Sequence, residues 1–127
     1  MKQFLMIAMA ALMLTVGATN MEAVIKKTAP ATVIHVVTVK WKTGTKPEQI
    51  KAALDGVQAL PMKYKGIVRV WTESIKVQGG KANAFVMEFK DEAALKAYTD
   101  SPAQLEWYKT YLDIREESAT FDITNKE

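Results

Sequence analysis

The segment from Val33 to Lys42 constrains the fold of this chain more than any other segment. It reads Val-Ile-His-Val-Val-Thr-Val-Lys-Trp-Lys, and most of its residues are β-branched, which favours an extended strand. Apolar side chains occupy both parities of the segment until it turns charged at Lys40 and Lys42. Because a strand that is apolar on both faces is covered on both faces, the sequence predicts a buried strand here.

His35 is the sole histidine of the chain, and it lies within this apolar strand. Histidine is the side chain whose charge ordinarily changes near neutral pH, so a histidine on a buried or cleft-lining strand is the first candidate for a functional site. The chain has no cysteine, which excludes disulfides, thiol catalysis and thiolate metal sites. With one histidine and no cysteine, we expect no metal centre and no cofactor.

The start of the chain has the pattern of a secretory signal peptide. Lys2 supplies the positive charge, and an apolar run from Phe4 to Val16 ends at small residues that suit cleavage after Ala18. The run is shorter than the roughly 20 residues that a membrane-spanning helix needs. We therefore expect export to the periplasm or the medium, with no membrane association after cleavage. The expected segments are a signal peptide over 1–18, a flexible leader over 19–32 and one domain over 33–127.

Charge is nearly balanced in the expected mature protein. The full chain has 17 Lys and Arg against 14 Asp and Glu, and removal of Lys2 leaves 16 against 14, a net charge of +2. The lysines are scattered, and arginine occurs only at Arg69 and Arg115. Since nucleic-acid binding normally needs clustered Lys and Arg, we expect no nucleic-acid partner.

A helix is predicted after the first strand. Thr45 and Glu48 have the spacing of a capping box, and apolar residues then recur at helical spacing from Ile50 to Leu60. Pro61 is expected to end this helix.

Two further strands, a second helical region and a last strand complete the pattern. Asp91 and Ser101 are expected to cap the two parts of the second helical region. Strict alternation would place Ile67, Arg69 and Trp71 on one face of the second strand. The expected elements are strands over 67–77, 83–90 and 118–124, and helices over 92–99 and from Ser101 onward.

The order β-α-β-β-α-β is that of the split βαβ, ferredoxin-like α+β fold. It gives a four-stranded antiparallel sheet with both helical regions on one face. Valine, tryptophan and phenylalanine side chains on the other face would make a large apolar patch for a monomer. Since two-fold pairing of sheets hides such a patch inside a dimeric α/β barrel, we expect a homodimer.

Three segments, taken in order, resemble the stress-responsive dimeric α/β-barrel (Dabb) family. Together they span Val33 to Thr124, nearly the whole expected domain. The first resembles the family's opening His-x-x-x-x-Lys-Phe/Trp-Lys strand, and the second resembles its helix start, Phe-x-Asp/Ser-x-x-x-Leu-x-x-Tyr. The segments are His35–Lys42, Phe89–Tyr98 and Phe121-Asp122.

The resemblance implies a ferredoxin-like homodimer whose sheets enclose a cavity. It also implies relatives that range from stress proteins without known chemistry to a plant polyketide cyclase. In cyclase-like members, the first-strand histidine and a second histidine, in a His-Pro-x-His motif, carry out acid-base chemistry. Here Ser101-Pro102-Ala103-Gln104 stands at that motif, and glutamine can orient a carbonyl group but cannot exchange protons near neutral pH. The matching positions are His35, Tyr98 and Asp122.

Each candidate catalytic residue has a functional and a structural interpretation. His35 is a candidate general base, with Asp122 fixing its tautomer. The same pair would equally tie two strands together. Tyr98 is a candidate hydrogen-bond donor to a ligand, or a core residue with a satisfied hydroxyl.

An apolar pocket for a small organic molecule is the matching hypothesis for ligand binding. Its aromatic members have the alternative of ordinary core and dimer-interface packing. The residues expected to line the pocket are His35, Trp41, Trp71, Tyr98 and Gln104.

Three functional hypotheses follow from the sequence. The first is an exported homodimer that binds a small apolar or aromatic molecule without catalysis. The second is a cofactor-free enzyme, cyclase-like or monooxygenase-like, that uses His35 as acid or base. The third is a purely structural stress protein that stabilises partners or assembles further.

Overall fold

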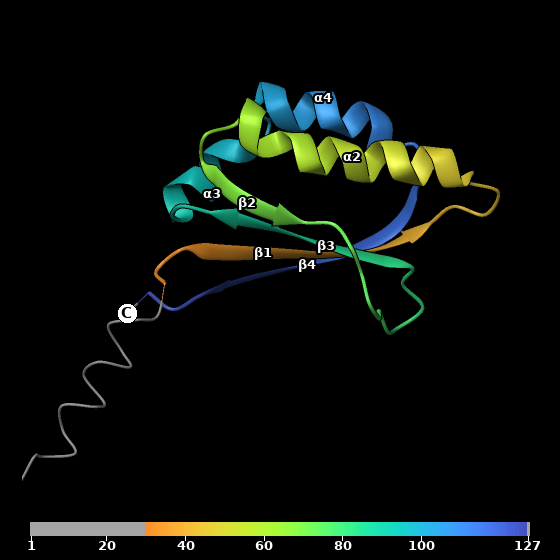
Figure 1. Cartoon of the computed structure of the whole chain (residues 1–127), viewed down its shortest axis with the longest axis horizontal. Helices are drawn as coiled ribbons and strands as arrows, with labels where there is room; N and C mark the ends of the chain where they lie inside the picture. The colour runs from red at the N-terminus through yellow and green to blue at the C-terminus, as the bar shows by residue number, and fades with distance from the viewer. Residues whose placement is uncertain (1–29, 127) are drawn as a thin grey trace, which may run out of the picture.

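The computed structural model describes residues 30–126. They form a four-stranded antiparallel sheet with three helices on one of its faces (Figure 1). The expected signal peptide and most of the expected leader lie outside the described residues. The elements are β1 (Val33–Trp41), α2 (Pro47–Lys63), β2 (Ile67–Trp71), β3 (Asn83–Phe89), α3 (Glu92–Tyr98), α4 (Pro102–Tyr111) and β4 (Arg115–Thr124).

β1 is a central strand of the sheet. The strand order is β2-β3-β1-β4, with β3 and β4 both antiparallel to β1. The register places His35 between Met87 on β3 and Asp122 on β4. Strands from the middle and the end of the chain therefore flank the sole histidine.

The protein core lies between the helices and the sheet. Alternate β1 side chains point toward the helices, and their register partners on β3 share that face because paired residues point the same way. The largest apolar side chains that are less than 2% exposed are Phe85, Phe89, Leu60, Met87, Val39 and Val57.

Aromatic side chains of α4 pack closely in this core. Trp107 stacks on Tyr111 with ring centres 4.4 Å apart and lies edge-on to Phe85 at 5.6 Å. Its indole N–H donates to the Ala53 carbonyl in α2 over 2.9 Å. A Cβ atom on Gly56 would come within 2.6 Å of the Trp107 ring, so glycine at this position lets α2 and α4 approach each other.

The second strand differs from its prediction in length and in facing. It ends at Trp71 because the Ser74 hydroxyl bonds to both the N–H and the carbonyl of Ala84, at 2.7 and 2.8 Å, in place of strand pairing. A bulge between Ile67 and Arg69 shifts the register. Ile67 therefore faces the helices, whereas Arg69 and Trp71 face the opposite side, and the prediction that all three share a face was wrong.

Helix α2 also begins and ends differently from its prediction. Lys46, not Thr45, is the N-cap residue, and the Gln49 side chain accepts the Lys46 N–H over 3.0 Å. Thr45 instead donates its hydroxyl to the Lys42 carbonyl at 2.6 Å. Pro61 lies inside the last turn and does not end the helix, because a proline this close to the end removes little of the hydrogen bonding.

The face of the sheet away from the helices is open in the protomer. Register pairs form a row across it from Trp71 through Val86 and Val36 to Phe121. Phe121 is 54% exposed, and Ile123 beside it is 58% exposed. Within the protomer, the helices cover β1 on one side, and cover on its other face would require a partner subunit.

Candidate functional site

His35 and Asp122 form a close pair on the helix side of the sheet. Their Nδ1 and Oδ1 atoms lie 2.6 Å apart. The His35 side chain is 17% exposed and that of Asp122 is 48% exposed. The imidazole also lies edge-on to Phe89, with ring centres 5.8 Å apart. The pairing follows from the register, since the two residues are direct partners across β1 and β4.

This pairing assigns the tautomer of a neutral His35 ring. An ionised carboxylate only accepts hydrogen bonds, so the hydrogen atom belongs on Nδ1. Nε2 then carries a lone pair and is free to accept a proton or a hydrogen bond. The arrangement is the orientation that a histidine base needs, and it would also serve a purely structural pair.

Two hollows meet at His35. The outer one, about 720 Å³, lies between α3 and the β4 edge and is lined in part by Leu95, Lys96 and Thr99. The inner one, about 130 Å³, lies between α4 and the sheet and is lined in part by Tyr98 and Gln104. His35 lines both hollows, so its side chain lies between them.

The inner cavity contains polar groups without partners. The hydroxyls of Tyr98 and Tyr111 are buried and make no hydrogen bond within the described residues. Each of these tyrosines is 3% exposed. Burial raises the pKa of Tyr98 far above its ordinary value, and nearby Tyr108 adds to the increase. Gln104 accepts the Asp100 N–H over 2.8 Å, which leaves its amide NH₂ group to donate elsewhere.

β4 supplies the remaining polar side chains of the site. Its helix-facing positions are Arg115, Ser118, Thr120 and Asp122, and the first three line the inner cavity. Tyr111, Arg115 and Ser118 also line the inner cavity, and the sequence did not predict them as site residues. The side of the sheet on which Arg115 lies could not be predicted from alternation along β4, because it depends on a register shift between Lys40 and Trp41.

The structure separates the expected ligand-binding residues. His35, Tyr98 and Gln104 lie together around the inner cavity. Trp41 lies behind that cavity, edge-on to Tyr111 at 6.0 Å, with its N–H donated to Asn83 over 2.7 Å. Trp71 lies on the open face of the sheet and has no place in the same cavity.

The described residues contain neither a cluster of metal ligands nor a membrane-spanning helix. Across 30–126, no three His, Asp or Glu side chains gather closely enough to hold a metal ion. None of the helices in that range has the length and apolar character needed to cross a bilayer.

Comparison with protein families gives one match over nearly the whole described domain. The family model described as Stress responsive A/B Barrel Domain, Dabb, matches residues 33–125. No curated protein sequence matches the chain significantly.

Several solved structures share the fold. A dimeric protein of unknown function with a ferredoxin-like fold, from Bacteroides fragilis, is 20% identical over 76% of this chain and 98% of that chain, with a TM-score of 0.62. A Dabb family protein from Mesorhizobium loti, also ferredoxin-like, is 20% identical over 73% and 95%, with a TM-score of 0.61. A hydroxynitrile lyase from Passiflora edulis is 18% identical over 77% and 96%, with a TM-score of 0.67. These likenesses confirm the predicted ferredoxin-like α+β fold.

Proposed function

The chain belongs to the stress responsive A/B barrel domain (Dabb) family, and from that premise we propose that it is an exported homodimer that binds a small organic molecule beside His35. The ligand occupies the inner cavity and carries an oxygen atom that accepts hydrogen bonds. The observation that carries this proposal is the pair of buried, unpartnered hydroxyls of Tyr98 and Tyr111.

A buried hydroxyl without a partner costs roughly 1–3 kcal/mol, and native proteins rarely leave such groups unpaired. Here two of them line one cavity of about 130 Å³. An apolar cavity of about 150 Å³ holds a benzene molecule, so the space suits a ring-sized or shorter molecule. An oxygen acceptor on that molecule would satisfy both hydroxyls.

The outer hollow supports an access route for this ligand. It is open to solvent between α3 and the β4 edge, and Leu95 and Ile123 give it apolar walls. His35 lines it as well as the inner cavity. A molecule that enters would therefore meet the imidazole before it reaches the tyrosine hydroxyls.

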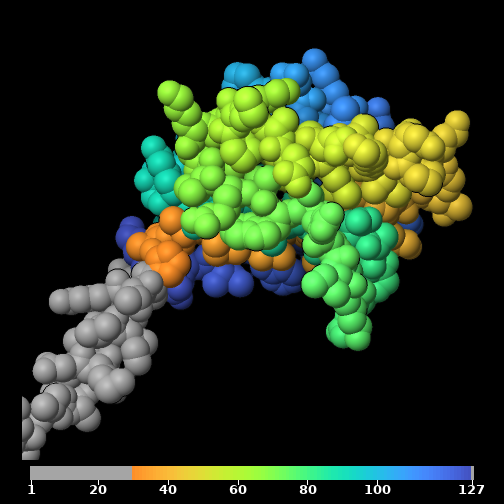
Figure 2. All heavy atoms as spheres, in the orientation of Figure 1, coloured from red at the N-terminus to blue at the C-terminus, as the bar shows by residue number. Residues whose placement is uncertain are grey.

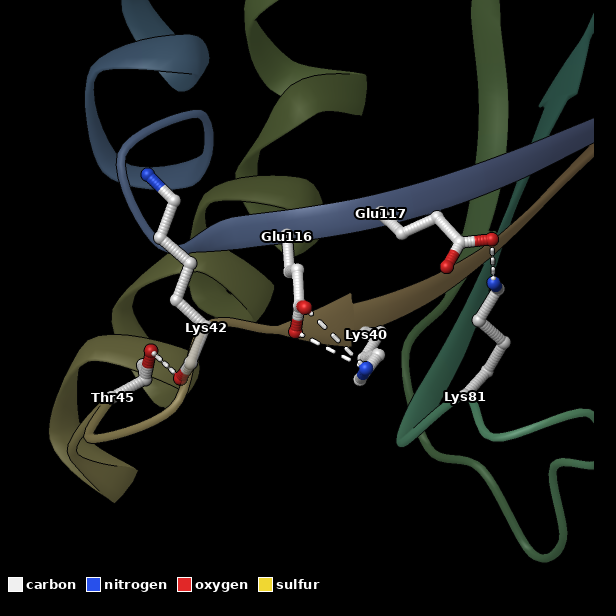
Figure 3. Close-up of polar contacts among 6 residues, drawn as sticks. All are labelled: Lys40, Lys42, Thr45, Lys81, Glu116 and Glu117. Carbon is white, nitrogen blue, oxygen red and sulfur yellow. Dashed lines mark hydrogen bonds and ion pairs between the residues drawn. The ribbon is translucent and has the colours of Figure 1, made fainter.

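The open face of the sheet supports the homodimer. Its centre is apolar, with Trp71 47% exposed beside Val86. Arg69 and Glu88 pair at one end of the face, 2.5 Å apart. At the other end, Lys40 pairs with Glu116 at 3.4 Å and Lys81 with Glu117 at 2.5 Å (Figure 3). An apolar centre with a charged rim is the usual anatomy of a protein interface.

The connection between β2 and β3 adds to this face. It extends beyond the sheet on the side opposite the helices, as the ribbon and the space-filling view both show (Figures 1 and 2). Ile75, within this connection, is fully exposed. The neighbour from Bacteroides fragilis is a dimeric protein, which is consistent with a partner subunit on this side.

Ligand binding is tested with acetophenone, a ring-sized ketone, and with thermal shift and calorimetry as readouts. We expect acetophenone to raise the melting temperature of the wild-type dimer and of Tyr64→Phe, but not of Tyr98→Phe. Tyr64 is the matched control because its hydroxyl lies outside the cavity and donates to the Ala94 carbonyl over 2.7 Å. Equal binding of acetophenone by both variants would contradict the proposal.

A cofactor-free enzyme is the second candidate, and the His35–Asp122 geometry favours it. Since the Passiflora edulis neighbour is a hydroxynitrile lyase, an aromatic hydroxynitrile such as mandelonitrile is the substrate to test. Nε2 of His35 would take the hydroxyl proton while the carbon–carbon bond to cyanide breaks, which forms an aldehyde and leaves cyanide to be protonated. Turnover that is lost in a folded His35→Ala variant supports this candidate, and turnover that His35→Ala retains removes it.

A further inference from the structure

Arg115 is a half-buried arginine without an acidic partner. It lies at the start of β4, and its guanidinium carbon is 5.5 Å from the centre of the Tyr111 ring. Among residues 30–126 no carboxylate lies within ion-pair distance of it, whereas Arg69 pairs with Glu88. Arg115 lines the inner cavity, so its charge is available to whatever enters there.

The inner cavity is rich in hydrogen-bond donors around Arg115. The hydroxyls of Tyr98 and Tyr111 are unpartnered, and Ser118 and Gln104 add a hydroxyl and an amide. No Asp or Glu within the described part of the chain lines this cavity. Asp122 lines the outer hollow instead, where His35 holds it.

The electrostatics around Tyr111 agree with this arrangement. Burial raises the pKa of the Tyr111 hydroxyl, while Ser118 and the positive charge of Arg115 act in the opposite direction. Neither side chain makes a well-formed hydrogen bond to that hydroxyl. The Arg115 charge therefore acts on Tyr111 while the tyrosine O–H stays available as a donor.

We propose that the ligand of this cavity is a small monocarboxylate with a short apolar or aromatic body, its carboxylate held by Arg115 and the Tyr111 hydroxyl. The planar guanidinium of arginine matches a carboxylate and bonds both of its oxygens. The volume of about 130 Å³ accommodates the carboxylate and part of a single ring, and the rest of the body would extend past His35 toward the outer hollow. This inference rests on the proposed function and assigns its ligand class.

The test compares benzoate with benzamide, which has the same ring and a neutral polar group. Dissociation constants are measured by calorimetry at pH 7 and constant ionic strength, on the full dimer. We expect benzoate to bind the wild type at least about tenfold more tightly than benzamide. Arg115→Gln should lose this preference. Lys109→Gln, which removes an exposed charge from α4, should retain it.

A third variant guards against misfolding. If Arg115→Gln fails to fold by circular dichroism, Arg115→Lys is used, and it should keep part of the preference because it retains the charge but loses the planar fork. Equal affinity for benzoate and benzamide in the wild type, or a preference that survives the change at Arg115, overturns the carboxylate assignment. If acetophenone binds and benzoate gains nothing, only this assignment fails. If none of the three compounds binds, the proposed function fails with it.

Discussion

The polarity of the two faces of β4 is the reverse of that expected for a strand at the surface of a monomer. The side that faces the helices carries Arg115, Ser118, Thr120 and Asp122, whereas Phe121 and Ile123 project from the open side. In a sheet with one solvated face, apolar side chains point toward the core and polar ones toward water. β1 and β3 follow that rule on their helix side, where Val39, Phe85 and Met87 are buried.

The contrast shows that the sheet has two separate tasks. β1 and β3 hold the protomer together by packing against α2 and α4. β4 contributes polar side chains to a cavity on one side and an apolar surface on the other. A polar lining needs a ligand or water, and an apolar surface needs a partner. Substitutions on one face at a time separate these two roles.

The largest effect is expected on the helix-covered face, at Phe85. Phe85→Ala should lower the free energy of unfolding by about 3–5 kcal/mol, because the ring is 1% exposed and contacts Trp107 and Tyr111 edge-on. Urea unfolding at two protein concentrations measures this change in the free energy of unfolding. A loss below about 1 kcal/mol would mean that this face does not hold the protomer.

The open face should respond through assembly rather than through protomer folding. Phe121→Asp places a charge in the proposed interface twice, once from each subunit, and we expect it to weaken the dimer by at least about 2 kcal/mol. Sedimentation equilibrium gives the dissociation constant. The control is Leu105→Asp, since Leu105 on α4 is similarly exposed but lies on the helical side. Equal dissociation by both variants would contradict an interface on the sheet.

Gly56→Ala tests how tightly the helices cover the sheet. Alanine in place of a helical glycine ordinarily stabilises by up to about 1 kcal/mol. Here the new methyl group would meet the Trp107 ring at 2.6 Å, so we expect a net loss of about 1–3 kcal/mol. Chemical unfolding of the variant shows whether its stability falls or rises, and a rise would show that the Trp107 ring can move away.

Tyr98→Phe and Tyr64→Phe compare an unpartnered hydroxyl with a partnered one. Without ligand, Tyr98→Phe should leave stability unchanged or raise it by about 1 kcal/mol, because it removes a buried group that has no hydrogen bond. Tyr64→Phe should lower stability by about 1 kcal/mol, since it deletes the bond to the Ala94 carbonyl. Losses of the same size would show that the Tyr98 hydroxyl has a partner after all.

The smallest effect concerns alkaline pH. Burial raises the pKa of both Tyr98 and Tyr111 above the ordinary value. The unfolded chain therefore releases these protons first, and the stability that the neutral rings provide is lost as the pH rises above about 10. Melting curves between neutral pH and high pH measure the decline. Tyr98→Phe should decline less steeply than the wild type, and a parallel decline would contradict the assigned shift.

Local features of the fold were predictable because their causes lie within a few residues. Asp91 accepts the Ala94 N–H over 2.7 Å and caps α3, and Ser101 caps α4 in the same way. The β-branched run that predicted β1 also placed His35 within a buried or cleft-lining strand. By contrast, the bulge after Ile67 depends on how β2 pairs with β3, and no residue pattern within β2 predicts it.

The candidate site was predictable in part for the same reason. His35, Tyr98 and Gln104 were singled out by residue type and family resemblance, and the structure places them around one cavity. Arg115 and Tyr111 were missed, since their facing is set by a register shift and by helix packing rather than by spacing along the chain.

By itself, the sequence determined the order of elements, the helix caps of α3 and α4, and the ferredoxin-like family of folds, because hydrophobic periodicity and capping are local signals. Only the tertiary structure decided which face of each strand meets the helices. That choice depends on strand register, and a shift of one residue moves every following side chain to the other face. Strand register placed Trp71 on the open face, and it brought Arg115 to the cavity that contains the two unpartnered tyrosine hydroxyls.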